Sequence, residues 1–135
     1  MFLLDTNVIS LIVKSRPNEG AIRWLKQADP AELRLSVVTL GEIVKGYAAL
    51  RRREPERAQR LADWCSQLED EYANRILNFD ARAAHQWGEV AAAFPNVKTE
   101  DAMIASIALV HSMTLVTHNV GDFTDLRLPL INPFD

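Results

Sequence analysis

The chain has 135 residues, of which 48% are hydrophobic and 24% are charged, and its formal net charge is −3. This length favours a single domain over residues 1–135 that buries a core of its own. The charge excludes a chain that attracts nucleic acid by its overall sign, although a local basic groove stays possible.

The sequence carries no sign of secretion, of a membrane span or of an internal disulfide. Cys65 is its only cysteine, which favours a reducing compartment. No secretory segment of about 7–15 apolar residues follows Met1, and no stretch reaches the roughly 18 apolar residues of a membrane span. We therefore expect a cytoplasmic protein.

Strand and helix signals alternate along the chain, which is typical of an α/β fold with a mostly parallel sheet. The first half contains two strands and four helices, the first helix being ended by the breaker cluster Ser15-Arg16-Pro17-Asn18. In chain order they are Phe2–Asp5, Val8–Val13, the helix through Ile22, Leu25 and Ala28, Leu33–Val38, Leu40–Arg53, and the helix from Pro55 through Leu68.

The second half continues the alternation with three strands and two helices. In chain order they are the strand Arg75–Phe79, a helix capped by Asp80, the helix Thr99–His111, the strand Met113–Thr117 and the short strand Leu128–Ile131. Because crossovers between parallel strands are right-handed, the helices should cover both faces of the sheet.

Four acidic residues recur at similar places in this pattern and form its strongest functional signal. Asp5 ends a strand, Glu42 and Asp122 follow strands after a short turn, and Asp101 opens a helix. The carboxyl ends of parallel strands share one edge of a sheet, where open α/β folds bind ligands. Four carboxylates crowded there would repel one another, which points to a divalent metal and a phosphate substrate. Oxygen ligands without a Cys/His cluster suit Mg²⁺ or Mn²⁺.

Each acid taken singly also has an ordinary structural interpretation. Asp5 could cap the next helix, and Thr39-Leu40-Gly41-Glu42 fits a capping box. Asp101 would complement a helix dipole, and Asp122 lies in an ordinary turn composition. Caps occur at both edges of a sheet, whereas all four acids fall where they can reach one edge, which favours a shared site. Asp80 also follows a strand and is expected to be a cap only.

The residues around these acids resemble the motifs of PIN-domain nucleases, in order and over essentially the whole chain. The four segments are Leu3-Leu4-Asp5-Thr6-Asn7-Val8-Ile9-Ser10, Glu42-Ile43-Val44-Lys45-Gly46, Asp101-Ala102-Met103-Ile104-Ala105 and Thr117-His118-Asn119-Val120-Gly121-Asp122-Phe123. The small size resembles VapC-type toxins of type II toxin–antitoxin pairs. The closing Ile131-Asn132-Pro133-Phe134 is similar to their FitB-like branch.

The resemblance implies a three-layer α/β/α sandwich with a parallel sheet of about five strands. It implies a Mg²⁺- or Mn²⁺-dependent endoribonuclease that hydrolyses RNA phosphodiester bonds as the toxin of such a pair. It also implies a homodimer and a small DNA-binding antitoxin, in assemblies up to a hetero-octamer with the antitoxin on DNA.

The resemblance also assigns roles to individual residues. Asp5 and Asp101 would be the principal metal ligands, and Glu42 and Asp122 would complete the acidic cluster. Three polar residues would orient ligands or substrate, namely Asn7, Thr117 and Asn119.

The chain departs from the family pattern at two places. His118 stands where the family often has arginine, which bears on substrate contact. The Phe94–Thr99 connection is short, which would displace Asp101 slightly.

Two other classes compete with a nuclease. A phosphoacceptor receiver domain is also a small doubly wound domain with an acidic Mg²⁺ pocket. However, Thr6-Asn7 rather than a second acid follows Asp5, Asp80 is a poor phosphoacceptor, and no lysine follows the fifth strand. A catalytically silent PIN-like binding module would have no need of all four acids.

Two further groups of residues are candidates for contacts with partners. A basic group would guide RNA to the acidic edge, although it is also an ordinary solvated helix end: Lys45, Arg51, Arg52 and Arg53. An apolar group could form a groove for an antitoxin helix: Tyr47, Leu50 and Trp64.

Overall fold

The computed structural model describes residues 1–13 and 17–134, so the expected breaker residues Ser15 and Arg16 lie outside the described residues. Strands, α-helices and 3-10 helices (η) alternate along the chain. In order they are β1 (Phe2–Leu4), α1 (Thr6–Ile9), η1 (Ser10–Val13), α2 (Glu19–Gln27), η2 (Pro30–Glu32), β2 (Leu33–Ser36), α3 (Val37–Leu50), α4 (Pro55–Glu71), β3 (Ile76–Leu77), α5 (Ala81–Ala93), α6 (Thr99–Val110), β4 (Thr114–Val116), η3 (Val120–Asp122), η4 (Thr124–Leu126) and β5 (Leu130–Ile131).

The strands form one five-stranded sheet in the order β3-β2-β1-β4-β5, with every neighbouring pair parallel. The chain builds outward from β1 through β2 to β3, and then returns to the other side of β1 for β4 and β5. The strand order therefore reverses between β1 and β4. In open α/β sheets, such a switch point leaves a crevice at the carboxyl ends of the strands.

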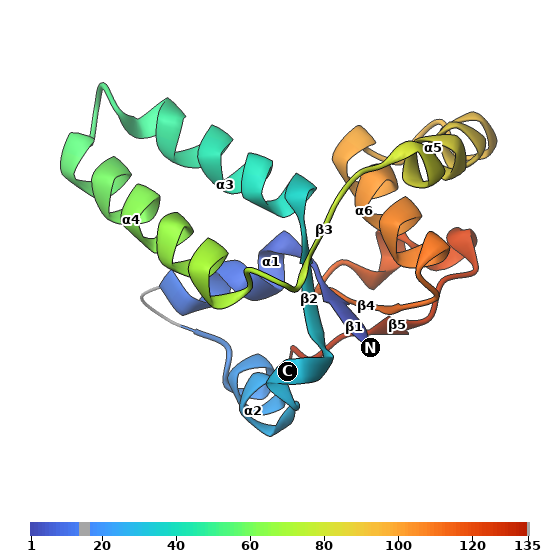
Figure 1. Ribbon diagram of the computed structural model, residues 1–135, viewed down its shortest axis with the longest axis horizontal. Helices are drawn as coiled ribbons and strands as arrows, with labels where there is room; N and C mark the ends of the chain where they lie inside the picture. The colour runs from blue at the N-terminus through green and yellow to red at the C-terminus, as the bar shows by residue number, and fades with distance from the viewer. Residues whose placement is uncertain (14–16, 135) are drawn as a thin grey trace.

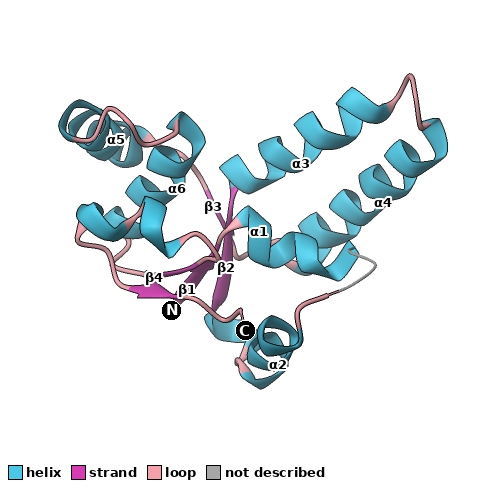
Figure 2. Ribbon diagram, turned by 180° about the vertical axis from the view of Figure 1, so that it is seen from behind, coloured by secondary structure: helices cyan, strands magenta, loops and turns pink. Residues whose placement is uncertain are grey.

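Helices cover both faces of the sheet because neighbouring strand residues point to opposite sides. Leu3 packs into the core on the side of α5 and α6, whereas Leu4 packs into the core on the side of α1 and α4. Leu115 and Val116 of β4 divide in the same way. Figures 1 and 2 show the strands between these two groups of helices. The prediction of a three-layer sandwich with about five parallel strands is confirmed.

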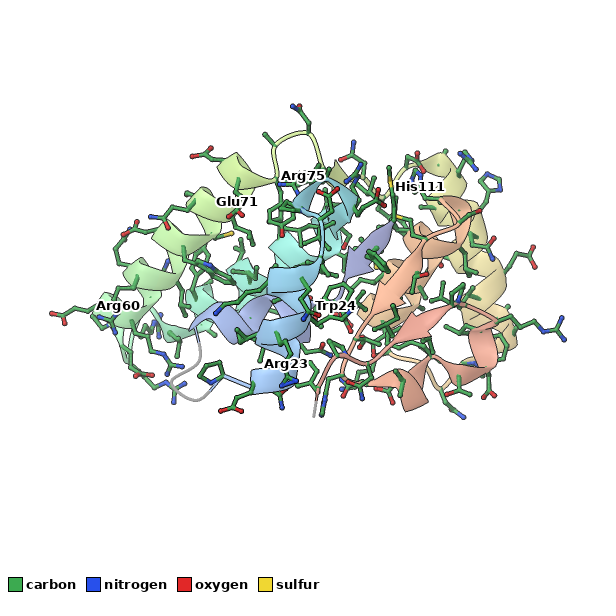
Figure 3. The ribbon with its side chains drawn as sticks, turned by 90° about the horizontal axis from the view of Figure 1, so that it is seen from below. Arg23, Trp24, Arg60, Glu71, Arg75 and His111 are labelled. Atoms are coloured by element: carbon green, nitrogen blue, oxygen red, sulfur yellow. The ribbon has the colours of Figure 1, made fainter. Side chains whose placement is uncertain are left out.

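α3 and α4 pack against each other as a hairpin whose far end projects away from the sheet (Figure 1). Figure 3 places Arg60 of α4 toward this outer end and Arg75 at the opposite end of the helix. The Arg75 guanidinium donates to the carbonyls of Pro30, Leu33 and Glu71 and stacks on the Tyr72 ring at 4.3 Å. Arg75 thus ties the end of α4 to the start of β2.

The junction between β2 and α3 differs from the sequence prediction. We expected a strand to Val38 and a helix from Leu40, but β2 ends at Ser36 and α3 begins at Val37. Ser36 is the N-cap, and its Oγ accepts from the backbone N–H of Thr39 at 3.2 Å. This cap outweighs the strand preference of a β-branched run. The capping box between Thr39 and Glu42, the structural alternative to a role for Glu42 in the site, is therefore wrong.

Other boundaries moved by smaller amounts. The first helix begins at Thr6 because Asp5 caps it, and it continues as a 3-10 helix to Val13. The edge strand β3 is shorter than the expected Arg75–Phe79. Within residues 1–13 and 17–134, no helix combines the length and the apolar character needed to cross a bilayer.

Candidate metal and phosphate site

A pocket of about 290 Å³ lies at the carboxyl ends of the strands, beside the switch point between β1 and β4. Its walls bring together all four acids singled out in the sequence, although they are far apart along the chain. The lining residues are Asp5, Thr6, Asn7, Ser10, Glu42, Lys98, Glu100, Asp101, Asn119 and Asp122. The short Phe94–Thr99 connection therefore does not keep Asp101 out of the pocket.

Asp5 is the most firmly held of the four acids. Its Oδ1 accepts from the backbone N–H of Thr6 at 2.8 Å, so the expected capping role is confirmed. Its Oδ2 accepts from the Thr117 hydroxyl at 2.8 Å and from the Asn7 amide at 3.3 Å. Burial raises the pKa of Asp5, and the hydrogen bond from Thr117 is the largest opposing effect. The carboxylate is thus fixed from three sides.

Asn7, Thr117 and Asn119 form a polar bridge across the switch point. The Asn7 amide donates to the Thr117 hydroxyl at 3.3 Å, and Asn7 Oδ1 accepts from the backbone N–H of His118 at 3.1 Å. The Thr117 hydroxyl also accepts from the backbone N–H of Asn119. The side chain of His118 takes no part in this bridge: its ring packs against the Phe134 ring, with the two centroids 4.4 Å apart. These contacts join the end of β1 to the end of β4.

Glu42 enters the pocket from α3, where it lies five residues after the first helical residue, Val37. Its Oε1 accepts from the Thr6 hydroxyl at 2.7 Å. Burial raises the pKa of Glu42, with smaller increments from Asp5 and Glu100, while the Thr6 hydrogen bond and the Lys45 charge oppose the rise. Glu42 therefore gains a carboxylate-stabilising partner that its own helix does not supply.

Asp101 carries the clearest electrostatic signature of the site. Burial raises its pKa from an ordinary 3.8 to about 6, and the charges of Asp5, Asp122 and Glu42 contribute to the rise. Lys98 opposes it. Asp101 lies in the first turn of α6. Its carboxylate accepts no hydrogen bond from another described side chain. The four acids thus repel one another, as the sequence predicted.

The donor set fits a hard divalent ion better than zinc. The pocket offers carboxylate and amide oxygens and contains no cysteine or histidine. In the described part of the chain, no three His, Cys, Asp or Glu side chains are already arranged to hold an ion. Repulsion between unneutralised carboxylates opposes their closer approach, and a cation would remove that repulsion.

Several lining residues were not found from the sequence. Thr6, Ser10, Lys98 and Glu100 all face the pocket. Thr6 and Ser10 lie within the first motif, and Lys98 and Glu100 shortly precede Asp101, so nearness to the acids was the available signal. Among the described residues of the lining, Lys98 is the one basic side chain.

The Arg51–Arg53 group does not reach this pocket. Arg51 follows the last residue of α3, about 14 Å beyond Glu42 along the helix axis. Its guanidinium lies 5.5 Å from the Tyr47 ring centroid. Lys45 is nearer, because it lies one helical turn from Glu42 and lines a neighbouring groove with it.

Asp80, which was expected to be a cap only, accepts from the backbone N–H of Ala83 at 3.0 Å, which confirms its capping role.

The family profile described as "PIN domain" matches residues 2–127, which is nearly the whole chain. The protein therefore belongs to the PIN domain family.

Several known proteins are similar to this chain over almost their full length. Plasmid stability protein StbB of Pseudomonas syringae pv. tomato is 34% identical and is matched over 100% of this chain and 99% of its own. Toxin FitB of Neisseria gonorrhoeae is 31% identical, with 99% of each chain covered. VapC ribonuclease Y4jK of Sinorhizobium fredii is 29% identical, with 100% of this chain and 99% of its own covered.

A solved structure shares the fold closely. The structure of FitAB bound to an IR36 DNA fragment matches with a TM-score of 0.89 and 31% identity, over 100% of this chain and 96% of that chain.

Replacing Asp101 with Asn should stabilise the protein in EDTA at neutral pH. The folded pKa of about 6 exceeds the ordinary 3.8, so between these values the folded state binds more protons than the unfolded state. Stability from this group is therefore present at low pH and is lost as pH rises toward 6. After allowance for solvent screening, Asp101→Asn should gain about 1 kcal/mol at pH 7.

Urea unfolding in EDTA at pH 4 and pH 7 measures this difference, with Glu89→Gln on the exposed face of α5 as the control. The free energies of unfolding of the wild type and of Asp101→Asn should converge at pH 4. A lower stability of Asp101→Asn at pH 7 would instead mean that Asp101 mainly complements the dipole of α6.

Proposed function

We propose that this protein is a divalent-metal-dependent endoribonuclease that acts in the cytoplasm as the toxin of a toxin–antitoxin pair, with residues 1–135 as one PIN domain. The supporting observation is the gathering of Asp5, Glu42, Asp101 and Asp122 in one pocket at the switch point of a PIN-family sheet. Relatives named a toxin and a VapC ribonuclease support the same activity.

The chain's own residues divide the work at this pocket. Asp5 and Asp101 would hold Mg²⁺ or Mn²⁺, with Glu42 and Asp122 completing the ligands. When bound, the ion supplies a more acidic water as nucleophile and neutralises charge that develops on the phosphate. Asn7 and Thr117 keep Asp5 in one orientation, and the backbone N–H of Asn119 holds the Thr117 hydroxyl. Lys98 lines the same pocket as the acids, where its positive charge would attract a phosphate oxygen of the RNA.

The two competing classes fit less well. A receiver domain has the flavodoxin-like strand order 2-1-3-4-5, whereas this sheet has the order β3-β2-β1-β4-β5. A silent binding module would not need four mutually repelling acids, three of which add to the effect of burial in raising the pKa of the fourth, Asp101.

Purified protein should cleave total RNA in Mg²⁺ or Mn²⁺ and stop in EDTA. Asp5→Asn and Asp101→Asn should each lower the rate by more than about 100-fold, because several kcal/mol of transition-state stabilisation depend on the bound ion. Glu89→Gln should cleave like the wild type. Cleavage that persists in EDTA, or in both acid variants, would contradict the proposal.

Basic side chains at the pocket and at the tip of the α3–α4 hairpin should contribute contacts to RNA phosphates. Binding is measured in Ca²⁺, which supports docking with little cleavage. The logarithm of the binding constant falls linearly with the logarithm of the salt concentration, and each lost phosphate contact makes this slope shallower by roughly 0.7 for single strands. Lys98→Ala should reduce the slope by one contact, and Arg51→Ala/Arg52→Ala/Arg53→Ala by two or three. Lys26→Ala on α2 is the control.

An unchanged affinity and slope in the triple variant would make the Arg51–Arg53 group a solvated hairpin tip. The Lys98 result then decides whether the pocket itself holds the phosphate.

The antitoxin is proposed to dock in an apolar groove of about 310 Å³ beside the acids. Val37, Val38, Phe79 and Met103 supply apolar walls, and Glu42 belongs to both this groove and the acidic pocket. A partner helix there could place a basic side chain among the acids. The residues expected to form such a groove, Tyr47, Leu50 and Trp64, do not line it; they are half-buried along the α3–α4 hairpin. The structure of FitAB bound to a DNA fragment supports a partner that binds DNA. We also propose that the homodimer joins this partner on DNA, in assemblies up to a hetero-octamer.

Co-expression with the small neighbouring reading frame should give a complex that no longer cleaves RNA. Light scattering of the toxin alone should give twice the 15.2 kDa of one chain, as a homodimer requires. Gly41→Gln should weaken the complex because its side chain enters the groove, whereas Gly41→Ala should not, since its Cβ meets nothing within 4 Å. A neighbour that neither co-purifies nor relieves growth inhibition would overturn the toxin assignment.

A further inference from the structure

Glu42 differs from the other three acids in the element that carries it. Asp5 follows β1, Asp101 lies on α6 against the sheet, and Asp122 ends η3. Glu42 instead lies on α3, which leaves the sheet and continues into the projecting hairpin (Figures 1 and 2). Its position relative to the sheet therefore depends on contacts at the base of α3.

Two threonine hydroxyls supply such a contact. Thr6 Oγ1 lies 2.7 Å from Glu42 Oε1 and 3.0 Å from Thr39 Oγ1. Thr39 precedes Glu42 by one helical turn, so both residues face the same side of α3. Thr6 belongs to the turn that also presents Asp5. The three side chains thus connect the end of β1 to the base of the hairpin.

The direction of these hydrogen bonds follows from the groups involved. An ionised carboxylate only accepts, so the single hydroxyl proton of Thr6 goes to Glu42. The proton between the two threonines must then come from Thr39. Thr39 is fully buried, and Thr6 is the hydrogen-bond partner of its hydroxyl among the described residues. A buried hydroxyl is costly to leave unpaired, which keeps Thr6 in one rotamer.

We propose that Thr39 and Thr6 form a hydroxyl relay that positions Glu42 for the metal site. This inference rests on the proposed function. The relay occupies Oε1 of Glu42, and no described side chain bonds Oε2, so one oxygen is anchored and the other is available to a cation. Thr6 and Thr39 are positioning residues, because they act through Glu42.

The test compares substitutions that remove the hydroxyl with substitutions that keep it. Thr6→Val keeps the shape of the side chain and loses the hydrogen bond, whereas Thr6→Ser keeps the hydroxyl. Mn²⁺ affinity is measured by calorimetry without RNA, and cleavage of a labelled single-stranded RNA is measured separately. Partners of metal ligands typically contribute 10–100-fold, so Thr6→Val should weaken Mn²⁺ binding and slow cleavage by at least about tenfold.

Thr6→Ser should stay within about threefold of the wild type. Thr39→Val should also weaken Mn²⁺ binding and slow cleavage, by a smaller factor, and Thr39→Ser should keep both near the wild type. The Thr39 variants provide a second test if Thr6→Val does not fold. Thr114→Val lies at the opposite end of β4 and is the control for loss of a threonine hydroxyl. A purely structural role would lower the melting temperature and leave the Mn²⁺ affinity unchanged.

A Glu42→Ala background isolates the route of the effect. With Glu42 absent, Thr6→Val should change Mn²⁺ affinity by less than about twofold, because interacting residues are not additive. Equal losses in both backgrounds, or wild-type Mn²⁺ affinity in Thr6→Val, overturn the relay. If the wild type binds Mn²⁺ but cleaves no RNA, the proposed nuclease fails while these affinities still decide on the relay. If it binds no Mn²⁺, both fail.

Discussion

The hydrogen bond between Thr117 and Asp5 is the contact on which the site depends. It spans 2.8 Å between the ends of β1 and β4, the two strands that meet at the switch point. A buried carboxylate is costly unless it is hydrogen-bonded, and Thr117, Asn7 and the Thr6 N–H satisfy Asp5 without neutralising it. The site therefore begins with one carboxyl group held in place at the end of the central strand.

The remaining acids are arranged around that charge with progressively weaker support. Glu42 has one hydroxyl partner, whereas no side-chain hydrogen bond from the described residues satisfies Asp101. Burial, and after it the repulsion from Asp5, Asp122 and Glu42, raises the pKa of Asp101 to about 6. This arrangement trades stability of the empty pocket for affinity toward a cation, as is usual where groups with shifted pKa values gather at a functional site.

The β2–α3 junction shows why part of the site could not be predicted from sequence. Val37-Val38-Thr39 has the composition of a strand, and Thr39-Leu40-Gly41-Glu42 has the pattern of a capping box. Ser36 instead caps the helix, which buries Thr39 and turns its hydroxyl toward Thr6. Glu42 still lies near Asp5, as the sequence predicted. It is held there by the hydrogen bond from Thr6, which is distant in sequence, and not by a local cap.

The sequence by itself determined the alternation of strands and helices, the parallel sheet and the four acids, because hydrophobic periodicity and the positions of acids after strands are local properties. The family motifs around Asp5, Glu42, Asp101 and Asp122 likewise need only the chain order. The tertiary structure alone decided that Lys98 and Glu100 line the pocket, that the Arg51–Arg53 group lies at the far end of a hairpin, and that Thr6 bonds Glu42. These facts depend on how elements distant in sequence pack together, which propensity and spacing do not encode.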